Sequence, residues 1–168
     1  MANNTHAIFN GTHCAFWDVD SYNLVGIAGT DMDNGTFVDL GEIGLANDGG
    51  YEFTVTPTTT SADFVCATPP QGYGVAAQVY VDPRYFTNEI GKPISVKHLL
   101  KYDCIEVDAA AFTTAPVTAN TYAKVTAGGK LTAQTGNGSS DAQFKILGTH
   151  TIDCGSELVP TWILQKIV

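Results

Sequence analysis

The fold is decided by residues 102–168, which run Cys104-Ile-Glu-Val107, Tyr122-Ala-Lys-Val125, Gly128-Gly129-Lys-Leu-Thr132, Ala142-Gln-Phe-Lys-Ile-Leu147 and then the closing stretch 158–168. Gly, Asn and Pro stand between these short apolar runs, and these residue types favour turns. Such spacing is typical of successive antiparallel strands, so it predicts a β-meander. The segment holds no catalytic constellation, and we expect it to pack and to assemble.

Strand patterns continue upstream of this segment. Tyr51-Glu-Phe-Thr-Val-Thr56 alternates apolar and polar residues, which indicates a half-buried strand that Pro57 ends. An Asn10-Gly11 pair suits a hairpin turn if both of its flanks pair. Further short strands are expected at 7–9, 14–17, 24–28, 36–40, 63–67 and 75–81, and a turn at 31–35. Residues 94–100 fit either a strand or one turn of helix.

Composition supports the same fold class. The 168 residues can bury a substantial core, and Thr, Val and aromatic residues are plentiful, which favours strands over helices. We therefore predict an all-β protein, an antiparallel β-barrel or sandwich-like meander with little helix. Its expected parts are an N-terminal arm with the first strands (1–30), an acidic β subdomain (31–90) and a C-terminal β subdomain (91–168). These parts form either two packed subdomains or one compact domain.

Charge is distributed unevenly along the chain. The formal net charge is −9, yet no Lys or Arg precedes Arg84, whereas ten Asp and Glu residues do. A surface of this sign repels phosphate backbones, so we expect no nucleic-acid partner. Two interpretations of the acidic half stay open: a solvated face that keeps the protein soluble, or a face that meets a basic patch on a partner subunit.

The cysteines and the N-terminus give no sign of export or of a redox role. Four Cys residues stand at 14, 66, 104 and 154 without a Cys-x-x-Cys pair, so free buried thiols are expected. The first residues carry no positively charged and apolar signal segment, and no apolar run is long enough to span a membrane. We expect a protein made in a reducing cytoplasm and without a membrane partner.

Motifs for metal or catalytic chemistry are incomplete. Residues 31–35, Asp-Met-Asp-Asn-Gly, lack both the ligand spacing and the later Glu of a calcium loop. His150-x-x-x-Cys154 and His13-Cys14 each offer two ligands where a tetrahedral site needs four. Neither Gly-x-Ser-x-Gly nor a catalytic cysteine signature occurs. We therefore expect no metal, no cofactor and no enzymatic activity, with a small hydrolase kept as a remote alternative.

Asparagines and aromatic residues leave a carbohydrate interpretation open. Asn-x-Ser/Thr triplets begin at residues 3, 10, 34 and 137, where turn chemistry explains them without glycans. Several aromatic side chains fill a core or line a sugar-binding surface: Phe16, Trp17, Tyr73, Tyr80, Tyr85, Phe86 and Trp162. A carbohydrate-binding β-sandwich is therefore the main alternative function.

A resemblance to a known family rests on a series of short blocks. They are Lys101-Tyr-Asp103 before a strand, Ala111-Phe112, Tyr122 to Val125, the Gly-Gly-Lys-Leu-Thr hairpin and Ala142 to Leu147, with 34–41 and 91–93 further upstream. In order and register, residues 34–168 resemble the C-terminal part of the head decoration, or capsid cement, proteins of tailed bacteriophages. The resemblance implies a structural virion protein on the outer capsid surface, made in the cytoplasm of a bacterial host. In the same phage context, the carbohydrate-binding alternative would belong to a tail or fibre.

The same resemblance implies the partners. They are the major capsid protein, whose neighbouring subunits this chain would bridge to stabilise the shell, and further copies of the chain itself, a trimer by analogy. The N-terminal arm is polar and ends in Ile8-Phe9, which suits addition to a strand edge on the shell. A frayed terminus is the alternative. The candidate capsid contacts are Asn3, Asn4, Thr5, His6, Ile8 and Phe9.

Overall fold

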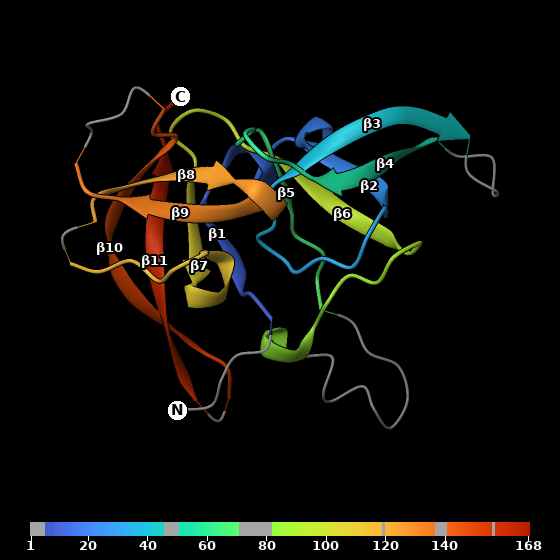
Figure 1. Ribbon diagram of the computed structural model, residues 1–168. Helices are drawn as coiled ribbons and strands as arrows, with labels where there is room; N and C mark the ends of the chain where they lie inside the picture. The colour runs from blue at the N-terminus through green and yellow to red at the C-terminus, as the bar shows by residue number, and fades with distance from the viewer. Residues whose placement is uncertain (1–5, 46–50, 71–81, 119, 137–140, 156) are drawn as a thin grey trace.

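Two β-sheets make up the protein in the computed structural model, which describes residues 6–45, 51–70, 82–118, 120–136, 141–155 and 157–168 (Figure 1). The six-stranded sheet has the order β1 (Phe9–His13), β7 (Cys104–Asp108), β11 (Leu158–Lys166), β10 (Phe144–Asp153), β8 (Tyr122–Thr126) and β9 (Lys130–Gln134). The five-stranded sheet has the order β3 (Val38–Leu45), β4 (Tyr51–Pro57), β2 (Asn23–Ala28), β6 (Pro93–His98) and β5 (Phe64–Cys66). The all-β prediction is confirmed, with a sandwich-like arrangement and no closed barrel.

Helical structure in the described residues consists of short 3₁₀ turns. They are η1 (Ala15–Trp17), η2 (Asp20–Tyr22), η3 (Pro83–Tyr85), η4 (Ala109–Ala111) and η5 (Ala127–Gly129). Among the described residues, no helix is long and apolar enough to cross a membrane.

Strand order in the six-stranded sheet departs from a simple meander. The β8–β9 and β10–β11 hairpins join successive strands, as predicted, but β7 pairs with β1 and β11 rather than with β8. Ile105 to Asp108 are buried along the whole of β7, which suits a strand with a neighbour on each side and cover on both faces. The order of the strands therefore depends on pairing between distant segments, which local turn signals do not specify.

Several predicted strands are confirmed and two local predictions are wrong. Strands form at β2, β4 and β5, and the ambiguous residues 94–100 contribute to strand β6. The predicted strand 75–81 lies outside the described residues. Asn10-Gly11 lies inside β1 and makes no turn, because both residues pair with β7, opposite Glu106 and Ile105. Residues 14–17 hold η1 instead of a strand.

The main core lies between the six-stranded sheet and the β5 end of the other sheet. Ile105, Leu131, Phe144 and Leu164 enter it from the six-stranded sheet, and Phe37 enters it from the segment before β3. The rings of Phe37 and Phe144 pack with centroids 5.3 Å apart. A second cluster covers one face of the five-stranded sheet: Ala28, Met32, Val38, Val55, Cys66, Ile94 and Val96. Burial of these apolar side chains holds the sheets together.

The two sheets divide the chain after β6. Strand β6 begins at Pro93 and belongs with β2 to β5, whereas β1 belongs with the C-terminal strands β7 to β11. The change of sheet thus falls between His98 and Cys104, and the chain crosses from one sheet to the other twice. The N-terminal segment consequently lies where both sheets can hold it.

Candidate functional site

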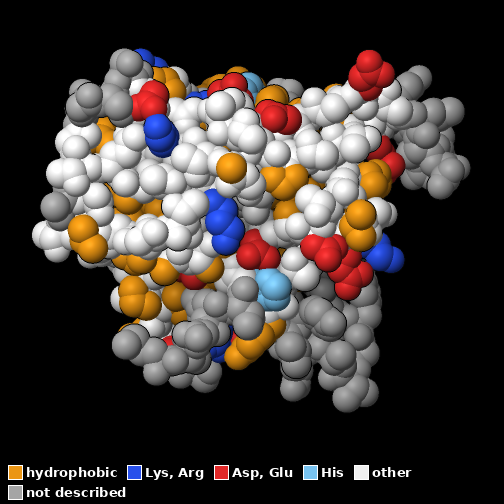
Figure 2. Space-filling model, viewed as in Figure 1, with side chains coloured by type: hydrophobic (Ala, Val, Ile, Leu, Met, Phe, Trp, Pro, Cys, Tyr) orange, Lys and Arg blue, Asp and Glu red, His pale blue; other side chains and the backbone are white. Residues whose placement is uncertain are grey.

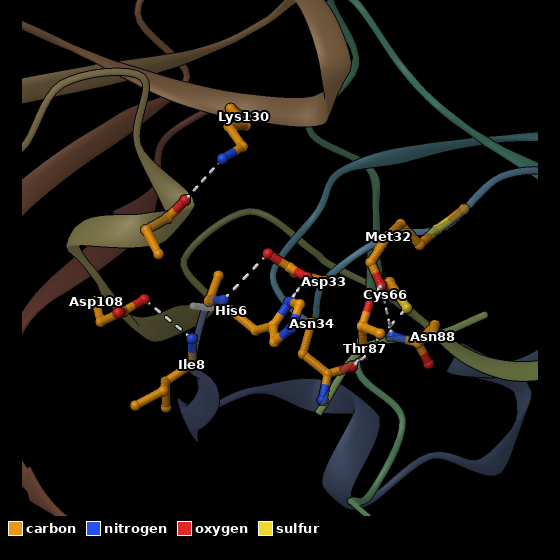
Figure 3. Close-up of polar contacts among 12 residues, drawn as sticks. His6, Ile8, Met32, Asp33, Asn34, Cys66, Thr87, Asn88, Asp108 and Lys130 are labelled. Carbon is orange, nitrogen blue, oxygen red and sulfur yellow. Dashed lines mark hydrogen bonds and ion pairs between the residues drawn. The ribbon is translucent and has the colours of Figure 1, made fainter. Parts of the chain in front are cut away.

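The N-terminal segment is bonded to the loop that precedes the five-stranded sheet's edge strand. Nδ1 of His6 lies 2.8 Å from Oδ1 of Asp33, and the backbone N–H of Ala7 donates to Oδ2 of the same carboxylate at 3.2 Å. The backbone N–H of His6 donates to the carbonyl oxygen of Arg84 at 3.2 Å. Figure 3 shows His6 pointing at Asp33 from the neighbouring segment. One carboxylate therefore fastens two successive residues.

The same segment is bonded to the six-stranded sheet. The backbone N–H of Ile8 donates to Oδ1 of Asp108 at 2.9 Å, and Asp108 ends β7. Asp108 is 1% exposed and Ile8 is 2% exposed, so this charge-assisted hydrogen bond lies away from solvent, where such bonds are strong. Phe9 then begins β1 opposite Val107. We call residues His6 to Phe9, with these bonds, the N-terminal anchor.

The candidate capsid contacts occupy different positions in the structure. Asn3, Asn4 and Thr5 lie outside the described residues. His6 and Phe9 are half-buried, whereas the side chain of Ile8 is packed inside the chain's own core and offers no surface to a partner. The sequence does not identify Asp33 and Asp108 as partners of this segment. They lie 26 and 100 residues from the backbone groups that they bind, and no motif marks such pairs.

A buried network of side-chain amides holds the loop to which the N-terminal anchor is bonded. The side-chain amide of Asn34 donates to the carbonyl of Thr68 at 2.8 Å, and its Oδ1 accepts from the N–H of Thr68 at 2.9 Å and from Nδ2 of Asn88 at 3.2 Å. Gly35 follows with a φ of +82°, a conformation that favours glycine. These bonds fix the loop that carries Asp33, so the Asp-rich motif of residues 31–35 serves as a turn (Figure 3).

Two hollows border the N-terminal anchor. The larger has a volume of about 450 Å³ and is mostly apolar, lined by Ile8, Phe9, Phe16, Trp17, Pro69 and Pro70 with Lys97 at its side. The smaller, about 360 Å³, has a mixed polar and apolar lining that includes His6, Asp33, Thr87 and Lys130. Desolvation lowers the pKa of the Lys97 ammonium, which donates to Oδ1 of Asn23 at 2.6 Å.

Buried charges join segments that are far apart in the sequence. Nζ of Lys166 donates to Oδ1 of Asp63 at 2.7 Å and to the carbonyl of Leu99 at 2.9 Å, and Lys166 lowers the pKa of the Asp63 carboxyl. The guanidinium of Arg84 binds Asp82, whose pKa it lowers, and Glu157 at 2.8 Å. Because burying an unpaired charge is costly, these pairs hold the segments in place rather than await a substrate.

A third buried charge lies in the centre of the six-stranded sheet. Oε1 of Glu106 accepts a hydrogen bond from Oγ1 of Thr161 at 2.5 Å and lies 2.8 Å from Nδ1 of His150. Glu106 is 2% exposed, and its carboxylate is held by Thr161 of the adjacent strand β11 and by His150 of β10, the strand beyond it. Thr161 is fully buried, so its hydroxyl is inaccessible to a substrate, and the arrangement stabilises the sheet.

The thiols are poorly suited to nucleophilic chemistry. Burial raises the pKa of Cys14 and that of Cys66 to about 12, so both stay protonated at neutral pH. The pKa values of Cys104 and Cys154 are raised as well, chiefly by burial. No group of three His, Cys, Asp or Glu residues in the described part of the chain could hold a metal ion. The polar groups of the site are therefore best suited to binding and anchoring.

Comparison of the chain with models of protein families, with curated proteins and with solved structures found no match.

Proposed function

We propose that this chain is a structural virion protein that binds the outer surface of a bacteriophage capsid and stabilises the shell by bridging neighbouring capsid subunits. The observation that carries the proposal is the N-terminal anchor. Residues 6–8 are bonded to one carboxylate in the loop before β3 and to another at the end of β7, so this segment is held in the fold rather than frayed. Such an anchor is what an arm that transmits force to a shell requires.

The arrangement of the strands suits a mechanical role. Strands β1 and β11 both pair with β7, so the first and last strands of the described part of the chain flank the same strand (Figure 1). A pull on the N-terminal arm would load the antiparallel hydrogen bonds between β1 and β7 along the strand direction, where several bonds must break together. The load would then pass into the six-stranded sheet.

The stabilising mechanism follows from mass action and symmetry. A protein that binds the assembled shell and not the separated subunits shifts the equilibrium toward the shell. Capsid symmetry repeats this contribution at every equivalent position, and self-association of the chain, a trimer being one form, would add multivalent attachment. We propose the major capsid protein as the partner. The residues before His6 would contact it, and Ile8 and Phe9 would hold the arm in the protein.

The first test is a measurement of copy number. Quantitative mass spectrometry of purified virions from the phage that encodes the chain should give a copy number equal to that of the major capsid protein or to a simple fraction of it. A handful of copies would place the protein on the tail or fibre instead. Absence from the virion would refute the proposal.

A second test addresses the arm without disturbing the fold. Deletion of residues 2–5 keeps Ala7 and Ile8, which are 3% and 2% exposed, so the thermal midpoint should stay within a few degrees of the parent's. Binding to heads that lack the protein should be lost. Replacement of residues 2–5 by Gly-Ser-Gly-Ser, which keeps the length, separates the role of their side chains from that of the backbone. Undiminished binding by the deletion variant would contradict the role of the arm.

One observation favours a carbohydrate-binding function as the second candidate. Trp17 is 65% exposed beside the larger hollow, and exposed aromatic rings are common in sugar-binding surfaces. A sugar also needs polar partners, and the amide of Asn34 and the hydroxyl of Thr68, which line the hollow, are already bonded within the chain. Binding to a glycan array that is lost in Trp17→Ala would support this function.

A further inference from the structure

Trp17 is an exposed aromatic side chain that is held in one position. Its ring packs against Phe16 with centroids 5.1 Å apart, and its Nε1 donates to the carbonyl oxygen of Gly11 at 3.0 Å. A Cβ on Gly11 would come 2.5 Å from Phe16 and 3.1 Å from Nε1 of Trp17, so the absence of a side chain at Gly11 permits this packing. The indole N–H is occupied, and the ring itself is what remains for a partner.

The backbone of the segment that carries Trp17 is also held by hydrogen bonds. The N–H of Ala15 donates to Oδ1 of Asp103 at 3.0 Å, and the side-chain amide of Asn23 donates to the carbonyl of Phe16 at 2.9 Å. Backbone bonds from Trp17 to Cys14 at 3.2 Å close the η1 turn. Because the segment is ordered before any partner arrives, binding through it costs less conformational entropy.

The residues next to Trp17 give this surface a negative charge. Asp18 and Asp20 are exposed and Val19 is 39% exposed, so an aromatic ring, an aliphatic side chain and two carboxylates lie together. We call residues 17–20 the Trp17 surface. On the face shown in Figure 2, Asp and Glu side chains gather over the half of the molecule that carries the five-stranded sheet. An incoming basic group would therefore meet a favourable potential.

The other exposed aromatic rings already have a cation of their own. Among the described residues, Tyr102 is 63% exposed and lies 5.6 Å from Nζ of Lys101, and Tyr85 is 42% exposed and lies 5.6 Å from Arg84. Lys97 lies over the ring of Phe16 at 5.9 Å. Trp17 takes part in none of these contacts, and a Trp face is the strongest of the aromatic sites for a cation.

We infer that the Trp17 surface is a docking site for a basic segment of the capsid protein, with an Arg or Lys side chain over the ring of Trp17 and its charge balanced by Asp18 and Asp20. The inference rests on the proposed function and names the chemistry of the partner. Trp17 and the half-buried Phe9 line the same hollow, so the docking site lies beside the N-terminal anchor. A second copy is a poor partner here, because two such surfaces would bring four carboxylates together.

The test measures binding of the full chain to heads that lack it. Co-sedimentation at increasing concentrations gives the affinity of the parent, of Trp17→Ala, of Trp17→Phe and of the double variant Asp18→Asn/Asp20→Asn. Tyr102→Ala is the matched control, because Tyr102 is equally exposed and has its own cation. Thermal unfolding of each variant shows whether it is folded at the temperature of the assay.

We expect Trp17→Ala to weaken binding by at least roughly tenfold, as truncation of an aromatic hot spot does, while Trp17→Phe keeps most of the affinity. The double Asn variant should bind more weakly and show a smaller loss of affinity with added salt. Tyr102→Ala should bind like the parent.

The outcomes separate the two proposals. If the parent binds and Trp17→Ala binds equally well, the docking inference is wrong and the capsid function stands. If the parent does not bind heads, the capsid function fails and the inference fails with it. Binding of the parent to a glycan array that Trp17→Ala abolishes would assign the surface to a sugar and overturn the inference.

Discussion

Gly129 tests the joint between the two sheets more sharply than any other position. It lies in the η5 turn between β8 and β9, with a φ of +68°. Its N–H donates to the carbonyl of Thr58 at 2.8 Å, and its carbonyl accepts from the N–H of Phe37 at 2.9 Å. The turn of one sheet is thus bonded to two segments that flank strands of the other. Substitution Gly129→Ala would place a methyl group inside this joint.

The magnitude follows from the geometry. The added Cβ would lie 2.1 Å from the carbonyl oxygen of Phe37 and 2.7 Å from Cγ2 of Thr36, and backbone atoms cannot rotate away as a flexible side chain can. Left-handed backbone costs a non-glycine residue about 1–2 kcal/mol. Overpacking of a tight site costs a further ~1–3 kcal/mol. We therefore expect Gly129→Ala to lower the free energy of unfolding by about 2–5 kcal/mol.

The neighbouring glycine supplies the control. Gly128 has a φ of +77°, but nothing lies within 4 Å of a Cβ built on it. Gly128→Ala should therefore bear the backbone cost alone, about 1–2 kcal/mol. Equilibrium urea unfolding followed by tryptophan fluorescence measures both variants. For a chain of this length each kcal/mol corresponds to a fall of about 2–4 °C in Tm. Equal stability of the two variants, within about 0.5 kcal/mol, would refute this account of the joint.

Three further predictions concern the core, the Lys166–Asp63 ion pair and the thiols. Ile8→Ala should lower the free energy of unfolding by about 2–5 kcal/mol, yet keep head binding at temperatures where it is folded, because Ile8 anchors the arm from inside; a loss of binding in the folded variant would make Ile8 a contact. Lys166 lowers the pKa of Asp63, so the stability that this pair adds is present above the ordinary carboxyl pKa near 4 and is lost as the pH falls through the lowered value. Asp63→Asn should be less stable than the parent at pH 7 and should lose less stability below pH 4, which acid titration of the unfolding midpoint checks; parallel curves would contradict the pairing. Iodoacetamide at pH 8 should alkylate Cys104 before Cys66 in the folded protein, because Cys66 is fully buried with a pKa of about 12, and mass spectrometry of timed samples would expose the opposite order.

Local patterns allowed the strands to be predicted, and distant contacts explain where the predictions failed. Tyr51 to Thr56 and the β8–β9 hairpin formed as expected, because alternation and turn residues act within a few positions of each other. Asn10-Gly11 carries a hairpin signal but lies inside β1, where it pairs with Glu106 and Ile105 of β7. Pairing with a distant strand prevailed over a local turn preference.

In the candidate site too, the sequence predicted some features and left others to the tertiary structure. Sequence analysis proposed an N-terminal arm from its polarity and from its apolar end, Ile8-Phe9, and it found no complete catalytic or metal motif. It gave no indication that Asp33 and Asp108 hold the arm. The sequence also did not show which aromatic side chains are exposed. Trp17 is 65% exposed, whereas Trp162 packs against Phe112.

The sequence by itself determined the all-β class, the acidic character of the N-terminal half and the approximate positions of most strands and turns. These properties depend on composition and on neighbours close along the chain. Tertiary structure alone decided the order of the strands, the union of β1 with the C-terminal sheet and the carboxylates that hold the N-terminal anchor. The reason is that strand pairing joins residues about 100 positions apart, and the hydrogen bond from the N–H of Ile8 to Oδ1 of Asp108 forms only where β1 pairs with β7.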